Sequence, residues 1–173
     1  MTVIYTDGAC QGNPGPGGWA WATSPEGTPA GSGGELRSTN QRMEVQAVLE
    51  ALRAHAHLPA GSVTIVSDST YVVNCFRDRW WVKWQQNGWK NSKKEPVANQ
   101  DLWEPLVAIV QQTAPAFRWV KGHSGEPMND LVDRLAVAAA VTVVAEARDR
   151  PAAAVATVVN SPADRPAQPG LFD

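Results

Sequence analysis

The sequence is poor in cysteine, in long apolar runs and in charge of one sign. Its two cysteines, Cys10 and Cys75, lie far apart and lack the spacing of zinc ligands, so neither a disulfide framework nor a zinc site is expected. The longest apolar run, residues 135–145, is too short to cross a bilayer. Residues 1–6 lack the basic start and apolar stretch of a secretory signal. We therefore expect a soluble, cytoplasmic protein with no membrane partner.

Length and charge set further limits. A chain of 173 residues is expected to form one domain with, at most, an appendage. Its 43% hydrophobic residues can supply a core, while its formal net charge of -2 excludes a nucleic-acid partner held by overall basicity. Any contact with nucleic acid must use a local patch. Eight tryptophans are the unusual feature, and four of them lie between positions 80 and 89.

The order of the predicted elements changes midway along the chain. Three strands follow one another first, and later strands alternate with helices, the first of which we expect Asn40 to cap. This order predicts an α/β fold with a five-stranded mixed sheet, three antiparallel strands and then two parallel ones, flanked by helices. The expected strands are residues 2–6, 18–23, 31–38, 63–67 and 117–120, and the expected helices are residues 41–56, 70–77, 100–112 and 127–147.

A change in composition marks the end of the predicted domain. From position 148 alanine, proline, aspartate and arginine prevail, and aromatic residues are missing until Phe172. Such a segment cannot bury enough apolar surface to fold by itself. We therefore expect a folded domain over residues 1–147 and a flexible tail over residues 148–173.

Acidic residues occupy positions that the predicted fold would bring together. Asp7 and Asp68 follow two predicted parallel strands, Glu44 lies in the first turn of a predicted helix, and Asp130 and Asp133 lie in the last helix. Each acid alone is typical of a helix cap or a dipole partner. Together they form a repelling cluster that hard divalent cations would stabilise, and Mg²⁺ prefers oxygen ligands. Two such ions suit in-line displacement at phosphorus.

With these motifs in this order and spacing, residues 2–140 resemble type 1 ribonuclease H. The resemblance implies a ribonuclease H-like fold and hydrolysis of the RNA strand of RNA/DNA hybrids with four carboxylates and two Mg²⁺, for which Mn²⁺ can substitute. The products would carry 5′-phosphate and 3′-hydroxyl ends. The first three carboxylates match Asp7, Glu44 and Asp68. The fourth matches Asp133, which lies ten residues after His123, with Asp130 as the alternative.

The resemblance also implies roles for residues that look ordinary by themselves. His123 lies between glycines in a predicted loop and matches the histidine that moves a proton and assists product departure. Amide side chains match contacts to the ribose 2′-hydroxyls of the RNA strand, and another set matches a pocket for a DNA phosphate. These positions are Asn13, Asn40 and Gln41 for the RNA strand, and Arg37, Thr39 and Asn99 for the DNA phosphate.

A local basic patch covers residues 77–94. Six lysines and arginines stand there against one acid, Asp78, which gives a charge of +5. The interleaved tryptophans can stack on sugars or bases while the cations follow phosphates, or they can form a small core; we expect both roles. The candidate hybrid-binding residues are Trp80, Trp81, Lys83, Trp84, Trp89 and Lys90, with Trp84 as the residue that matches a DNA-contacting aromatic.

Two interpretations compete with a monomeric, metal-dependent endoribonuclease. One is a non-catalytic hybrid-binding or clamp-tethered adaptor on the same fold, and the other is a recombinase or exonuclease that would cleave DNA strands. The complete set of carboxylates argues against the adaptor, and the three RNA-contacting amides argue against a DNA nuclease. In the tail, Gln168 followed by Leu171 and Phe172 resembles the short peptide by which bacterial replication proteins bind the sliding clamp. A clamp is therefore an expected partner.

Overall fold

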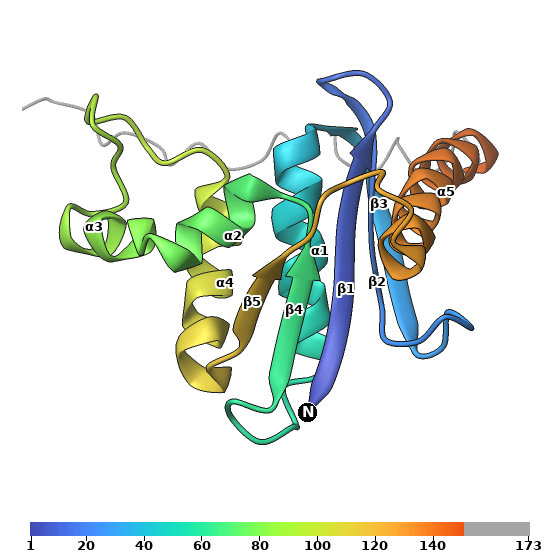
Figure 1. The fold of residues 1–173 in the computed structure, drawn as a ribbon. Helices are drawn as coiled ribbons and strands as arrows, with labels where there is room; N and C mark the ends of the chain where they lie inside the picture. Colours follow the sequence, from blue (N-terminus) through green and yellow to red (C-terminus); the bar gives the residue numbers. More distant parts are fainter. Residues whose placement is uncertain (151–173) are drawn as a thin grey trace, which may run out of the picture.

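A single mixed sheet of five strands organises the molecule (Figure 1). The computed structural model describes residues 1–150. The strand order is β3-β2-β1-β4-β5, in which β1, β2 and β3 pair antiparallel, and β4 pairs parallel with both β1 and β5. The strands are β1 (Thr2–Cys10), β2 (Gly15–Ala22), β3 (Ala30–Ser38), β4 (Val63–Ser67) and β5 (Ala116–Trp119). This arrangement confirms the predicted fold class.

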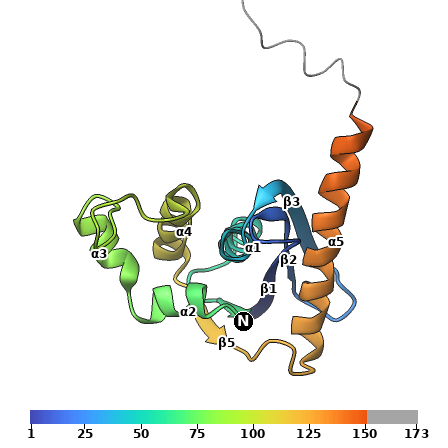
Figure 2. The same cartoon turned by 90° about the horizontal axis from the view of Figure 1, so that it is seen from above.

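Helices cover both faces of the sheet. Helix α1 packs on one face and is itself covered by α4, whereas α5 packs on β1, β2 and β3 from the other face (Figure 2). Ile4, Ile65 and Trp103 are fully buried in the core between the sheet and these helices. Within residues 1–150, no helix combines the length and the apolarity needed to cross a membrane. The helices are α1 (Asn40–Ala54), α2 (Thr70–Arg77), α3 (Trp80–Gln86), α4 (Gln100–Thr113) and α5 (Pro127–Asp149).

The structure corrects three details of the predicted elements. Strand β1 continues to Cys10 because its second half pairs with β2, so Asp7 lies inside the strand and not at its end. Thr39 caps α1, since its Oγ1 accepts the Arg42 N–H at 3.2 Å, and Asn40 is already the first helical residue. Helix α3 has no counterpart among the predicted helices. The predicted clamp-binding tip, Gln168, Leu171 and Phe172, lies outside the described residues.

A close approach of β1 to α1 fixes the position of the first helix. A Cβ on Gly8 would collide with the backbone nitrogen of Glu44 and the carbonyl carbon of Met43. These are backbone atoms, which cannot move without displacing the helix. Gly8 therefore sets the spacing between the strand that carries Asp7 and the helix that carries Glu44.

Gly8→Ala is expected to destabilise the protein by about 3 kcal/mol, because overpacking against backbone forces α1 to move. For a chain of this size, thermal unfolding should show a melting temperature lower by roughly 6 to 12 °C. Gly122→Ala is the comparison and should cost less stability, because the nearest atoms to its new methyl group all belong to the side chain of Asp68, which can move without displacing a helix. An unchanged melting temperature for Gly8→Ala would contradict the close packing.

Candidate active site

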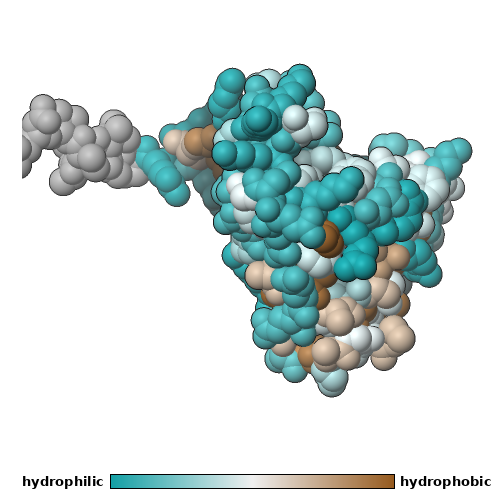
Figure 3. Space-filling model, turned by 90° about the vertical axis from the view of Figure 1, so that its left-hand side faces the viewer, coloured by the Kyte–Doolittle hydropathy of each residue, from teal (hydrophilic) through white to brown (hydrophobic). Residues whose placement is uncertain are grey.

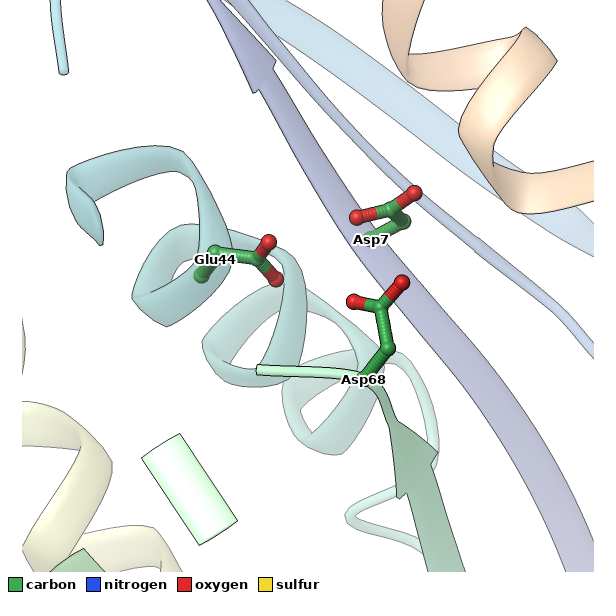
Figure 4. Close-up of side chains that lie close together, drawn as sticks. All are labelled: Asp7, Glu44 and Asp68. Carbon is green, nitrogen blue, oxygen red and sulfur yellow. The ribbon is translucent and has the colours of Figure 1, made fainter. Parts of the chain in front are cut away.

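Three carboxylates from three elements converge where the parallel strands end (Figure 4). Asp7 projects from β1 two residues beyond the last β1–β4 pair, Tyr5 with Val66, and Asp68 directly follows β4. Glu44 projects from the second turn of α1. One carboxylate oxygen from each of the three residues lies within 4.8 Å of the others. The structure therefore brings together three of the four acids that the sequence singled out.

Few hydrogen bonds compensate these carboxylates. Asp7 Oδ1 accepts the Gly8 N–H at 2.7 Å, and Asp68 Oδ2 accepts the Asn129 side-chain amide at 3.1 Å. Within residues 1–150, Glu44 Oε2 is buried and has no hydrogen-bond partner. A buried oxygen without a donor is costly, so the site favours a cation at this position.

Burial and mutual repulsion raise the pKa values of two acids in the cluster. Burial, followed by the charge of Asp68, raises the pKa of Asp7 to about 7. Burial, followed by the charges of Asp7 and Asp68, raises the pKa of Glu44 well above its usual range. Near neutral pH the cluster thus binds a proton more readily than ordinary carboxylates, unless a cation takes the proton's place.

The fourth predicted carboxylate, Asp133, lies in α5 outside the group of three. After burial and Asp68, the charge of Asp133 also raises the pKa of Asp7, so Asp133 lies near the same site. The alternative, Asp130, is not among the main causes of this shift. Asp133 also lies four residues after Asn129, which places both on one face of α5. These observations favour Asp133 over Asp130.

Asn129 is a site residue that the sequence analysis missed. Its side chain is 2% exposed, and its amide group donates to Asp68 at 3.1 Å. Its Oδ1 is also buried and unpartnered within the described part of the chain. The sequence feature that could have indicated Asn129 is its position one helical turn before Asp133, on the same face of the helix.

Known proteins with this sequence pattern and fold share one description. The RNase H family profile matches residues 1–141. The chain is 49% identical over 135 residues to the ribonuclease H of Syntrophomonas wolfei, an alignment that covers 78% of this chain and 92% of that protein. It is 44% identical over 163 residues to the ribonuclease H of Treponema pallidum, an alignment that covers 86% of this chain and 96% of that protein. The chain belongs to the RNase H family.

Solved structures of RNase H proteins share the fold. LC9-RNase H1, described as a type 1 RNase H with the type 2 active-site motif, superposes with a TM-score of 0.69 at 31% identity, over 89% of this chain and 83% of that chain. LC11-RNase H1 in complex with RNA/DNA hybrid superposes with a TM-score of 0.63 at 22% identity, over 83% and 99%, and shows the common fold. The predicted family and the predicted class of enzyme, a ribonuclease H, are confirmed.

Around the carboxylates, the structure pairs two of the predicted RNA-contacting residues of this RNase H. Asn13 Oδ1 accepts the Asn40 N–H at 3.2 Å, which ties the loop after β1 to the start of α1. Gln41 is the next residue and is exposed. With its oxygen engaged, the Asn13 side chain keeps its NH₂ group available as a donor.

Arg42, which the sequence analysis also missed, joins the elements that carry the predicted phosphate pocket. Its Nε donates to Glu35 at 2.9 Å, and its two terminal nitrogens donate to both oxygens of Asp101 at 2.9 and 2.8 Å. The guanidinium group lowers the pKa of Asp101. Arg42 thus ties β3 and α1 to the start of α4.

The three predicted phosphate-binding residues lie on those tied elements. Arg37 is exposed near the end of β3, Thr39 caps α1, and Asn99 precedes α4 with a left-handed φ of 59°. Asn99 makes no side-chain hydrogen bond to the helix that it precedes. Its side chain is therefore not used to cap α4.

His123 lies on the loop between β5 and α5 and is exposed, with a φ of 51°. It is outside the group of three carboxylates. Its neighbour Gly122 nevertheless packs directly on the site, because a Cβ there would come within 2.5 Å of Asp68 Oδ2. The loop that carries His123 therefore rests against Asp68, a contact that requires Gly122 to stay small.

The tryptophans of the basic patch are half-buried and pack against the protein core. Trp84 packs edge-on against the buried Trp103, with ring centroids 5.4 Å apart, and lies 6.0 Å from Trp89. Trp80 packs on Tyr71. Lys83 and Lys90 are exposed. Figure 3 looks at this side of the molecule, where a hydrophilic protrusion stands above more apolar surface. The expected small core is thus present beneath an exposed basic rim.

The raised pKa of Asp7 predicts how stability depends on pH without divalent cations. The folded state binds the proton of Asp7 more tightly than the unfolded state does. The contribution of this proton to the free energy of unfolding is therefore fully present below about pH 4. It is lost as the pH rises toward 7, the pKa in the folded protein. In EDTA, the melting temperature should therefore fall between pH 5 and pH 8.

In Asp7→Asn the melting temperature should fall less with rising pH. At pH 8 the free energy of unfolding of this variant should exceed that of the wild type by on the order of 2 kcal/mol, which corresponds to a melting temperature higher by about 4 to 8 °C. Mg²⁺ should raise the melting temperature of the wild type more than that of Asp7→Asn. Asp149→Asn, at an exposed position in the last turn of α5, is the control and should behave like the wild type. Identical pH profiles for wild type and Asp7→Asn would refute strong repulsion in the cluster.

Proposed function

We propose that this RNase H hydrolyses the RNA strand of RNA/DNA hybrids with two Mg²⁺ ions at the site of Asp7, Glu44, Asp68 and Asp133. The observation that carries the proposal is the convergence of three carboxylates within 4.8 Å at the carboxyl end of the parallel strands. Repelling acids in a buried cluster have no evident structural use, whereas a nuclease needs them to hold cations. The solved complex of LC11-RNase H1 with a hybrid adds support from a protein of the same fold.

The donor set fits hard divalent cations. All of its members are carboxylates, which Mg²⁺ and Mn²⁺ both accept as ligands. The buried Glu44 Oε2 lacks a partner within the described residues, and after burial the charges of neighbouring acids raise the pKa values of Asp7 and Glu44, as expected where a cation would neutralise them. When bound, two ions would make a water molecule more acidic and neutralise charge at the scissile phosphate and the departing 3′ oxygen.

The protein's own groups orient this machinery. The Gly8 N–H fixes one oxygen of Asp7, and the Asn129 amide fixes one oxygen of Asp68. The three carboxylates lie around a shared space (Figure 4). Asp133 approaches from α5. His123, on the exposed loop, would hold a proton as the product leaves, a role that histidine side chains often take in catalysis.

Discrimination of the two strands follows from the surroundings of the acids. The amides of Asn13, Asn40 and Gln41 would recognise ribose 2′-hydroxyls, which only the RNA strand has. On the other strand, Arg37, Thr39 and Asn99 would hold a phosphate, with the basic rim of α3 beyond them. The Arg42 bridge keeps these two regions in register.

The direct test follows end-labelled RNA/DNA hybrid, duplex RNA and duplex DNA with Mg²⁺. The wild type should cleave only the RNA of the hybrid, leaving 5′-phosphate and 3′-hydroxyl ends. Asp7→Asn should lower the rate at least about a hundredfold, since the cation-binding set is broken, whereas Asp149→Asn should not. Binding of the hybrid without cleavage by the wild type would favour the adaptor, and cleavage of duplex DNA would favour a DNA nuclease.

Asn129→Ala should lower the cleavage rate by about 10- to 100-fold, as loss of a group that orients a metal ligand does. Raising the Mg²⁺ concentration should recover part of the loss, because the substitution weakens cation binding and leaves the carboxylates in place. Asn129→Asp, which removes the amide donor but keeps the shape, should not restore activity. Full activity of Asn129→Ala would show that Asp68 needs no support.

We also propose a bacterial sliding clamp as a partner of the tip Gln168, Leu171 and Phe172. The support is the sequence of the tip alone, which lies outside the described residues. A peptide of residues 160–173 should bind a clamp, and Leu171→Ala with Phe172→Ala should abolish that binding. Unchanged association of the doubly substituted chain would rule the contact out.

A further inference from the structure

A groove of about 650 Å³ lies beside the edge strand β5, and apart from Arg77, Arg79 and Trp81 of the basic patch its lining has no role in the proposed function. Helix α2, the start of α3, the end of α4 and β5 enclose it. Its floor contains the stacked rings of Phe76 and Phe117, whose centroids are 4.4 Å apart, together with Val73, Val110 and Pro115. Below the hydrophilic protrusion, the same side of the molecule shows apolar surface (Figure 3). The groove therefore suits an apolar guest.

The rim of this groove is cationic. Three arginines line it, Arg77, Arg79 and Arg118, and none of its lining residues is acidic. Arg77 pairs with Asp78 at 2.9 Å, but this pair is exposed and such pairs contribute little. Arg79 lies over the ring of Trp81, and Arg118 donates to the neutral Tyr5 hydroxyl. A guest that carries a carboxylate next to its apolar part would complement this charge.

The floor distinguishes between two kinds of anionic guest. A nucleobase would place its polar edges against valine, phenylalanine and proline, which offer no hydrogen-bond partners. A large apolar amino-acid side chain has no such need. The groove thus fits a peptide in which apolar side chains adjoin a carboxylate.

The chain itself contains such a peptide outside the described residues. Leu171-Phe172-Asp173 joins two large apolar side chains to a carboxylate. Between the end of α5 and Leu171 lie residues 150–170, whose fully extended length is roughly 70 Å. A domain of this size is only about 40 Å across. The segment is therefore long enough to reach the groove from the same molecule.

We propose that Leu171-Phe172-Asp173 docks in this groove of its own chain, with the apolar side chains on the phenylalanine floor and the Asp173 carboxylate at the arginine rim. Tethering gives the segment an effective concentration on the order of millimolar, so that a weak contact is sufficient. Docking would cover the half-exposed Trp119, whose indole N–H donates to the backbone oxygen of Asp68. A docked tip would also be withheld from any other partner.

The experiment compares indole N–H signals in ¹H–¹⁵N spectra of the full chain and of the Leu171→Ala, Phe172→Ala double variant. The Trp81→Phe and Trp119→Phe variants assign the signals of these two tryptophans, and both signals should shift by more than their line widths. The shifts should be equal at about 20 and about 200 µM protein, because both concentrations lie below the effective concentration of the tethered tip. Trp103, which is buried and bonded to Tyr71, is the internal control and should not shift.

A second comparison tests the rim. In an Arg79→Glu background the new glutamate repels the Asp173 carboxylate, so the tip does not dock. The tip substitutions should then cause no further shift of the Trp119 indole signal. Unshifted Trp81 and Trp119 signals in the first comparison would overturn the proposal. Shifts that grow with protein concentration would also overturn it, in favour of docking between copies. If both signals shift when a dT12 oligonucleotide is added but do not shift on the tip substitutions, the groove binds nucleic acid and not the tip. None of these outcomes depends on nuclease activity.

Discussion

Repulsion among three clustered carboxylates is the constraint around which this molecule is arranged. Asp7 comes from the middle of β1, Asp68 from the end of β4 and Glu44 from α1, and burial of Asp7 followed by the charge of Asp68 raises the pKa of Asp7 to about 7. A fold can hold such a cluster only because the surrounding core stabilises the elements that carry it. In functional terms the repulsion is useful, since it converts the binding of divalent cations into a gain in stability.

Close backbone approaches make the cluster possible. Without a side chain at Gly8, β1 and α1 touch, and without one at Gly122 the loop before α5 rests on Asp68. Asn129 adds the hydrogen bond that fixes Asp68. Residues far apart in the sequence thus bring the three acids to within a few ångströms of one another.

Much of this arrangement could be predicted from the sequence, because it depends on local patterns. The strand before Asp68 and the helix around Glu44 are evident from β-branched runs and helical spacing, and the parallel order of the strands then brings their acids together. The N-cap was misplaced by one residue because Thr39 and Asn40 both have side chains that cap helices well. The end of β1 was misjudged because its outer half is stabilised by β2, a pairing that local propensity does not reveal.

Contacts between distant residues could not be predicted in the same way. Arg42 binds Asp101 across 59 positions, and Asn129 binds Asp68 across 61, so neither pair forms a local pattern. Helix α3 was missed because Trp84 packs on the distant Trp103 and Trp80 on Tyr71, contacts that no local apolar pattern reveals. The groove beside β5 likewise arises only when α2, α4 and β5 meet.

The central claim is that Asp7, Glu44 and Asp68 together hold divalent cations. The most direct measurement is anomalous X-ray scattering from crystals of the chain with Mn²⁺ and an uncleaved RNA/DNA hybrid. Our account predicts two anomalous peaks at the cluster of Asp7, Glu44 and Asp68. Peaks at other places, or none at the cluster under conditions in which the hybrid is bound, would contradict it.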